Sequence, residues 1–167
     1  AFEARWQPAR TVSGDYYDFI PLDGGRLGLV IADVADKGMG AALYMALART
    51  LIRTYAGDYP DRPDQALQAA NGRILADTGA DLFVTVFYGV LETGSGLLTY
   101  CNAGHHPPLL LQPLAGRGAG MGDAVQALPG RCMALGVLED AGWEHGMIEI
   151  PPGATLLLYT DGTVDAH

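Results

Sequence analysis

The chain has 167 residues, of which 49% are hydrophobic and 17% are charged, and its formal net charge is −9. This length and composition allow a buried core without metals or disulfides, which excludes a disordered chain, and the acidic balance without any Lys/Arg cluster argues against nucleic acid or anionic membranes as partners. No apolar stretch approaches the ~20 residues that cross a bilayer. The two cysteines form no C-x-x-C motif, which favours a reducing, cytoplasmic location. The length fits one domain, so we expect a single domain over residues 1–167.

The predicted elements begin and end with strands. Short turns at residues 23–25 and 93–96 predict antiparallel hairpins between neighbouring strands. Segments rich in β-branched and aromatic residues predict strands at Asp15–Pro21, Arg26–Asp33, Leu82–Glu92, Gly96–Asn102, Pro108–Gln112, Trp143–Ile150 and Ala154–Tyr159.

Two helices are predicted between these strands. Apolar residues at i, i+4 spacing indicate a helix from Gly38 to Tyr55, and a second helix starts near Pro63 and runs to Gly79. Two consecutive amphipathic helices among hairpins favour an α+β layered sandwich over alternating βαβ units. The segment Gly116–Cys132 is rich in Gly and Ala and has no clear period, so we interpret it as an irregular surface loop.

Three aspartates lie beside glycine or another small residue, at points where an apolar segment starts or stops. They are Asp15, Asp33 and Asp161. A turn would explain any one of them, but three together indicate carboxylates that converge at one rim of the sheets. Such a cluster repels itself unless cations occupy it, and all-oxygen ligands select Mg²⁺, Mn²⁺ or Ca²⁺ rather than zinc. Two such ions can hold a phosphate and activate a water, so the pattern predicts metal-assisted phosphoester hydrolysis.

Five segments, in this order, resemble the bacterial SpoIIE-like branch of the metal-dependent PPM (type 2C) protein serine/threonine phosphatases. They are GDYYDF, ADVADKGMGAALYM, FVTVFYGVLE, YCNAGHHPPLL and LLLYTDGTVDA, and they extend over nearly the whole chain. The resemblance implies an α+β fold of the PPM type, an α-β-β-α sandwich of two mainly antiparallel sheets flanked by helices. It also implies hydrolysis of phosphoserine or phosphothreonine on a protein substrate, namely an anti-sigma-factor antagonist of the STAS type.

The resemblance assigns roles to particular positions. Asp15 matches the first metal carboxylate, Asp33 the one that bridges two Mn²⁺ or Mg²⁺ ions, and Asp161 the late metal ligand. Val34 matches a residue whose backbone carbonyl serves as a ligand, often through water. The implied nucleophile is a metal-bound hydroxide. Arg10 has the spacing of the phosphate-binding arginine of the eukaryotic relatives, and the alternative is an ordinary surface arginine.

Four further residues of these motifs have structural alternatives to a functional role. Asp18 should point to the opposite face of its strand from Asp15, so we interpret it as a structural acid. Lys37 is either a phosphate or carboxylate contact or a solvated turn residue. His105 and His106 precede two prolines, and we favour structural histidines bonded to the backbone over metal or general-acid roles.

Other phosphatase chemistries fit the sequence less well. LLLYTDGTVDA resembles the haloacid-dehalogenase signature, but Tyr159 replaces its nucleophilic aspartate. Neither Cys101 nor Cys132 has the arginine of a C-x₅-R motif, and no G-x-x-x-x-G-K-[ST] phosphate loop is present.

The PPM family usually supplies another metal-binding aspartate further along the chain, beyond the position of His167. We therefore expect a C-terminally truncated domain. We also keep a second hypothesis, a catalytically weak PPM-like regulatory or interaction module. Family members often carry such a domain behind a sensor or coiled-coil segment, so an upstream sensor or dimerisation is a further expectation.

Overall fold

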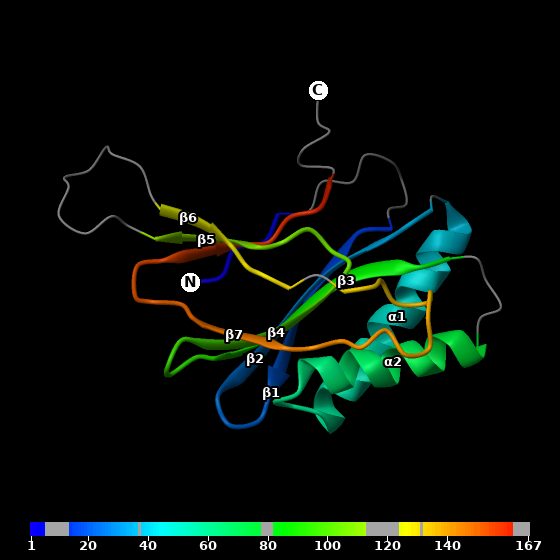
Figure 1. The fold of residues 1–167 in the computed structure, drawn as a ribbon, viewed down its shortest axis with the longest axis horizontal. Helices are drawn as coiled ribbons and strands as arrows, with labels where there is room; N and C mark the ends of the chain where they lie inside the picture. The colour runs from blue at the N-terminus through cyan, green and yellow to red at the C-terminus, as the bar shows by residue number, and fades with distance from the viewer. Residues whose placement is uncertain (6–13, 37, 78–81, 113–123, 131, 162–167) are drawn as a thin grey trace.

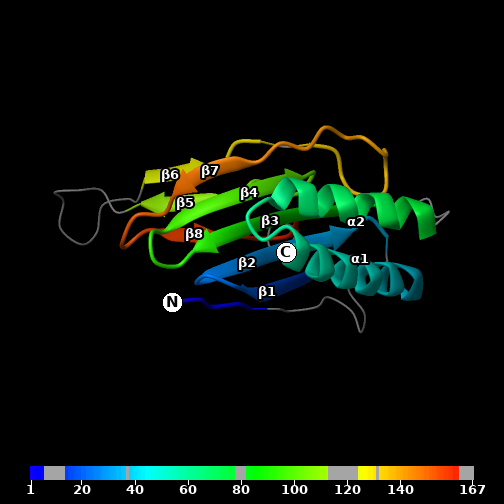
Figure 2. The ribbon, with the colours of Figure 1, turned by 90° about the horizontal axis from the view of Figure 1, so that it is seen from below.

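The computed structural model describes residues 1–5, 14–36, 38–77, 82–112, 124–130 and 132–161. These residues form three layers: a pair of helices, a five-stranded sheet and a three-stranded sheet (Figures 1 and 2). Every strand pair in both sheets is antiparallel. The predicted α+β class with two antiparallel sheets is therefore confirmed.

The five-stranded sheet forms the middle layer and has the order β1-β2-β3-β4-β7. A tight turn joins β1 to β2, where Gly24 and Gly25 both have positive φ (74° and 71°), a conformation that glycine adopts without steric cost. The strands of this sheet are β1 (Tyr16–Leu22), β2 (Arg26–Val34), β3 (Val84–Glu92), β4 (Leu97–Ala103) and β7 (Gly146–Glu149).

The two helices, α1 (Met39–Asp58) and α2 (Pro63–Asp77), lie side by side across one face of this sheet (Figure 2). Tyr44, Ala48 and Ile52 of α1 repeat every four residues and are all buried, so one stripe of the helix contacts the sheet. The prediction of a helix from Gly38 is confirmed, although α1 continues to Asp58, beyond the predicted end.

The three-stranded sheet has the order β6-β5-β8 and consists of β5 (Leu109–Gln112), β6 (Ala124–Ala127) and β8 (Thr155–Leu157). The prediction of an irregular loop over Gly116–Cys132 is wrong at β6. All four residues of β6 are exposed and pair with β5 through their backbones, so their side chains follow no apolar period that sequence reasoning could detect.

The space between the two sheets is a second hydrophobic core, in which Leu29 and Ile31 of β2 and Phe87 of β3 pack with Leu110 of β5. Along β2 the same face continues to Asp33, so the apolar layer ends in an acidic residue. No helix in the part of the chain that the structure describes is long and apolar enough to cross a membrane.

Candidate metal centre

Asp33 lies near the end of β2, on the face of the sheet that looks toward the second sheet. Side chains on a strand alternate between faces, so Asp33 shares its face with Ile31, which is buried between the sheets. Asp15 directly precedes β1, whose first residue Tyr16 pairs with Ala32. Continuing this antiparallel register by one residue sets Asp15 opposite Asp33.

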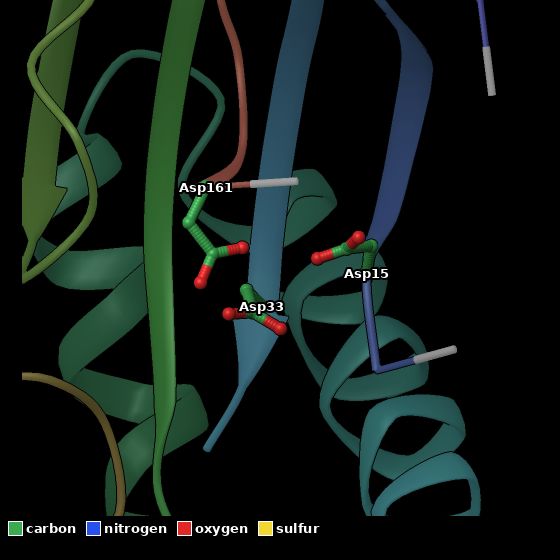
Figure 3. Close-up of side chains that lie close together, drawn as sticks. All are labelled: Asp15, Asp33 and Asp161. Carbon is green, nitrogen blue, oxygen red and sulfur yellow. The ribbon is translucent and has the colours of Figure 1, made fainter. Parts of the chain in front are cut away.

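Asp161 reaches the same place from a segment beyond the end of β8. Figure 3 shows the carboxylates of Asp15, Asp33 and Asp161 turned toward one another from three separate parts of the chain. One carboxylate oxygen from each residue lies within 4.8 Å of the other two. Asp15 and Asp33 are half-buried and Asp161 is exposed, so solvent reaches the cluster. The structure therefore brings together the three aspartates that the sequence singled out.

Gly14 allows the Asp15 segment to approach β2 closely. A Cβ atom on Gly14 would lie 3.1 Å from the carbonyl oxygen of Val34 and 3.4 Å from Oδ1 of Asp33. Contacts this short would force one of the neighbours to move by a few tenths of an ångström. Glycine at this position thus permits the spacing between the two acids.

The backbone carbonyl of Val34, predicted to be a metal ligand, accepts a hydrogen bond from the backbone N–H of Asp36 at 2.8 Å. A carbonyl oxygen has two lone pairs, so one is still available to a cation or a water. Its role as a ligand stays a prediction.

The chemistry of the donor set suits a hard divalent cation. Three carboxylates within 4.8 Å repel one another, and a bound cation relieves that repulsion. Oxygen donors of this type match Mg²⁺, Mn²⁺ and Ca²⁺, whereas zinc favours the nitrogen and sulfur ligands that this cluster lacks. The arrangement can therefore hold a divalent metal at a position that solvent reaches.

Asp18 lies outside the cluster, on the opposite face of β1. Its Oδ2 atom is 2.6 Å from Nη1 of Arg53 and 3.3 Å from Nε of Arg49, and both arginines belong to α1. The interpretation of Asp18 as a structural acid agrees with these ion pairs. Arg10, predicted to contact phosphate, and Lys37 lie outside the described residues.

His105 is buried, and its Nε2 atom lies 3.1 Å from the carbonyl oxygen of Tyr159. This contact agrees with the interpretation of His105 as a histidine bonded to the backbone. The exposed ring of His106 stacks on the ring of Tyr159, with centroids 5.6 Å apart and an interplanar angle of 23°.

Thr85 of β3 is a residue of this region that sequence reasoning missed. It pairs with Asp33 in the β2–β3 register, and its hydroxyl lies 3.0 Å from Nδ1 of His105. A threonine in a strand is ordinary in isolation. Only the register, which places Thr85 next to Asp33, could have pointed to it.

Comparison with known proteins places these features in a family. The sequence matches the family model of stage II sporulation protein E (SpoIIE) over residues 23–167. Protein IcfG of Synechocystis sp. is 32% identical over a match 193 residues long, gaps included, which covers 98% of this chain and 29% of that protein. Phosphoserine phosphatase RsbU of Bacillus subtilis is 28% identical, over 96% of this chain and 45% of that protein. The chain thus spans less than half the length of these relatives.

Solved structures agree with this match. The structure of the RsbU and RsbW domains of Rv1364c from Mycobacterium tuberculosis has a TM-score of 0.77 and 28% identity, covering 95% of this chain and 42% of that one. The SiaA-PP2C domain of Pseudomonas aeruginosa has a TM-score of 0.76 and 22% identity, covering 96% of this chain and 61% of that one, and it supports the fold alone. The chain belongs to the SpoIIE family and has the PP2C-type phosphatase fold that the sequence motifs implied.

Proposed function

We propose that this chain is a divalent-metal-dependent protein serine/threonine phosphatase. The observation that carries the proposal is the cluster of Asp15, Asp33 and Asp161, whose carboxylate oxygens lie within 4.8 Å of one another. The names of two relatives support it, since RsbU and RsbP of Bacillus subtilis are phosphoserine phosphatases. Their similarity extends over 96% and 98% of this chain.

The three aspartates would hold two ions, Mn²⁺ or Mg²⁺. By the family resemblance, Asp33 would be the residue that contacts both ions, and its carboxylate lies within 4.8 Å of those of Asp15 and Asp161. The carbonyl of Val34 would serve as a further ligand. When bound, such ions polarise phosphoryl oxygens and lower the pKa of a coordinated water.

The residues of the chain would position the metal ligands and leave the site open to a phosphorylated side chain. Asp15 directly precedes β1 and Asp33 lies on β2, and the backbone hydrogen bonds between these antiparallel strands hold the two side chains near each other. Asp161 is exposed, so a phosphorylated side chain can approach from its side. We further propose that Arg10 contacts the phosphate, because a guanidinium fork matches two phosphate oxygens.

The proposed substrate is a phosphoserine or phosphothreonine on a small protein, an anti-sigma-factor antagonist of the STAS type. The family resemblance supports this class, and so does the combination of RsbU and RsbW domains in the structural neighbour from Mycobacterium tuberculosis. A net charge of −9 disfavours nucleic acid as a partner. An upstream sensor segment or dimerisation would supply regulation, and the two free cysteines fit a cytoplasmic location.

The test is phosphate release from a phosphoserine-bearing STAS-type protein, measured with increasing Mn²⁺ or Mg²⁺ and after chelation. Asp33→Ala is the control variant. Since removing residues that only support metal ligands costs about 10–100-fold, loss of Asp33 should lower metal-dependent turnover by more than about 100-fold. Release that neither depends on metal nor responds to Asp33→Ala would contradict the proposal. Metal binding without any release would instead favour a PPM-like interaction module.

A further inference from the structure

A single buried histidine connects the strand beside Asp33 to the segment that carries Asp161. His105 is 1% exposed, and its ring lies 3.0 Å from the Thr85 hydroxyl at Nδ1 and 3.1 Å from the Tyr159 carbonyl at Nε2. We propose that His105 and Thr85 are positioning residues that fix Asp161 relative to Asp33. The proposal rests on the metal site described above, because it concerns how that site is held together.

The two ring contacts engage both nitrogens of His105. The Tyr159 carbonyl can only accept a hydrogen bond, so Nε2 of His105 must carry the proton and donate it. Nδ1 faces the hydroxyl of Thr85, a group that can donate or accept a hydrogen bond. Both ring nitrogens therefore have a partner, and the ring forms a continuous bridge from β3 to Tyr159.

At the β3 end, the bridge is attached beside Asp33. Thr85 pairs directly with Asp33 in the antiparallel register of β2 and β3. The Thr85 hydroxyl also lies 3.4 Å from the backbone carbonyl oxygen of Asp33, at the long limit of a hydrogen bond. A change at the Thr85 side chain therefore acts next to the backbone of a cluster aspartate.

At the other end, the bridge holds a segment that the sheet does not fix. The last pair between β5 and β8 joins Leu109 to Leu157, so residues 158–161 lie beyond the ladder. Tyr159, two residues before Asp161, is contacted there at its backbone by His105 and at its ring by His106. These contacts give the Asp161 segment an anchor that its own strand does not supply.

The backbone around His105 is itself fixed. The N–H of His105 donates to Oδ1 of Asn102 at 2.8 Å. Gly104 has a φ of 76°, and a Cβ atom there would lie 3.1 Å from the backbone nitrogen of Ala134. The ring is therefore held from β4 and presented to both of its partners, as a positioning residue requires.

The test measures Mn²⁺ affinity of the whole chain by calorimetry. Thr85→Val removes the hydroxyl and keeps a branched side chain that suits a strand, and Thr85→Ser restores the hydroxyl. We expect Thr85→Val to weaken Mn²⁺ binding about tenfold and Thr85→Ser to change it less than about twofold, since outer residues of metal sites contribute about 10–100-fold. Thr99→Val, the same change on the helix-facing side of β4, is the matched control and should not alter Mn²⁺ binding.

A double-mutant comparison separates positioning from general stability. In an Asp161→Asn background, Thr85→Val should lower Mn²⁺ affinity by less than about twofold, because the residue that the bridge positions is already impaired. Equal losses in both backgrounds, or equal losses for Thr85→Val and Thr85→Ser, would overturn the bridge. Failure of the unmodified chain to take up Mn²⁺ would instead overturn the metal site itself, so the two failures are distinguishable.

Discussion

Two acids three residues apart, Asp15 and Asp18, end in opposite surroundings on the two faces of the central sheet. Asp18 points toward α1, where its carboxylate meets the guanidinium groups of Arg49 and Arg53. Asp15 points to the other side, where its carboxylate meets those of Asp33 and Asp161 (Figure 3).

The difference shows that the surroundings of an acidic side chain, and not its residue type, determine its role. On the helix side the chain supplies its own cations, so an acid there binds one element of the fold to another. On the inter-sheet side three carboxylates lie close together, an arrangement that a cation from solution stabilises. The same residue type in one short motif therefore meets two different environments, and strand alternation decides which face each side chain occupies.

Of the substitutions that test this comparison, Asp15→Asn should have the largest effect on Mn²⁺ affinity. Asp15→Asn keeps the size of the side chain but removes a charge from the cluster. We expect Mn²⁺ affinity to fall at least about tenfold, which corresponds to about 1.4 kcal/mol of binding free energy. Calorimetric titration with Mn²⁺ measures this directly.

Asp18→Asn is the matched control for that measurement. It should leave Mn²⁺ affinity within about twofold of the unmodified chain. It should lower the free energy of unfolding by about 0.5–1 kcal/mol, because the two arginines are partly exposed and their ion pairs are screened by water. If Asp18→Asn weakened Mn²⁺ binding as much as Asp15→Asn does, the division between the two faces would be wrong.

The sequence predicted the three cluster aspartates because each marks its own position locally. Asp15 and Asp161 lie beside glycines, and Asp33 ends a long apolar run, so motif and periodicity were sufficient. The face of Asp18 followed from the two-residue period of a strand in the same way.

The features that the sequence did not predict are those that depend on contacts between residues far apart in the sequence. The hydrogen bonds of His105 join residues 20 and 54 positions apart, and no local pattern records them. Strand β6 was missed because its exposed residues are held by backbone pairing with β5. Which acids share a face is a local property, whereas what holds that face together is not.

A smaller effect is expected from Gly14→Ala, which leaves all the acids in place. The added Cβ would contact Val34 and Asp33 at 3.1–3.4 Å, so the Asp15 and Asp33 segments must separate slightly. Because packed interiors transmit such shifts, we expect Mn²⁺ affinity to fall about three- to fivefold in the calorimetric titration. Gly72→Ala is the control, because Gly72 is exposed on α2 and a Cβ atom there would meet nothing. This substitution should raise the free energy of unfolding by about 0.5–1 kcal/mol and leave Mn²⁺ affinity unchanged. An unchanged Mn²⁺ affinity in Gly14→Ala would show that the close approach of residue 14 to β2 is not needed for metal binding.

The smallest expected effect concerns a second acid on the helix side, Asp64 in the first turn of α2. Burial raises the pKa of Asp64, but hydrogen bonds from Arg62, at 3.0 and 2.7 Å, and from His145 outweigh it and leave the pKa below its usual value of 3.8.

A lowered pKa means that the folded state holds the Asp64 proton less tightly than the unfolded state does. The resulting stabilisation is therefore present above about pH 3.8 and is lost as the pH falls through the folded-state pKa. We expect a contribution of about 0.5 kcal/mol, since Arg62 is partly exposed. Denaturant unfolding at pH 7 and pH 3 should show a smaller pH-dependent loss for Asp64→Asn than for the unmodified chain, with Mn²⁺ affinity at pH 7 unchanged. An equal loss in both proteins would place the acid sensitivity elsewhere, whereas a changed Mn²⁺ affinity would mean that acids on the helix side also act on the cluster.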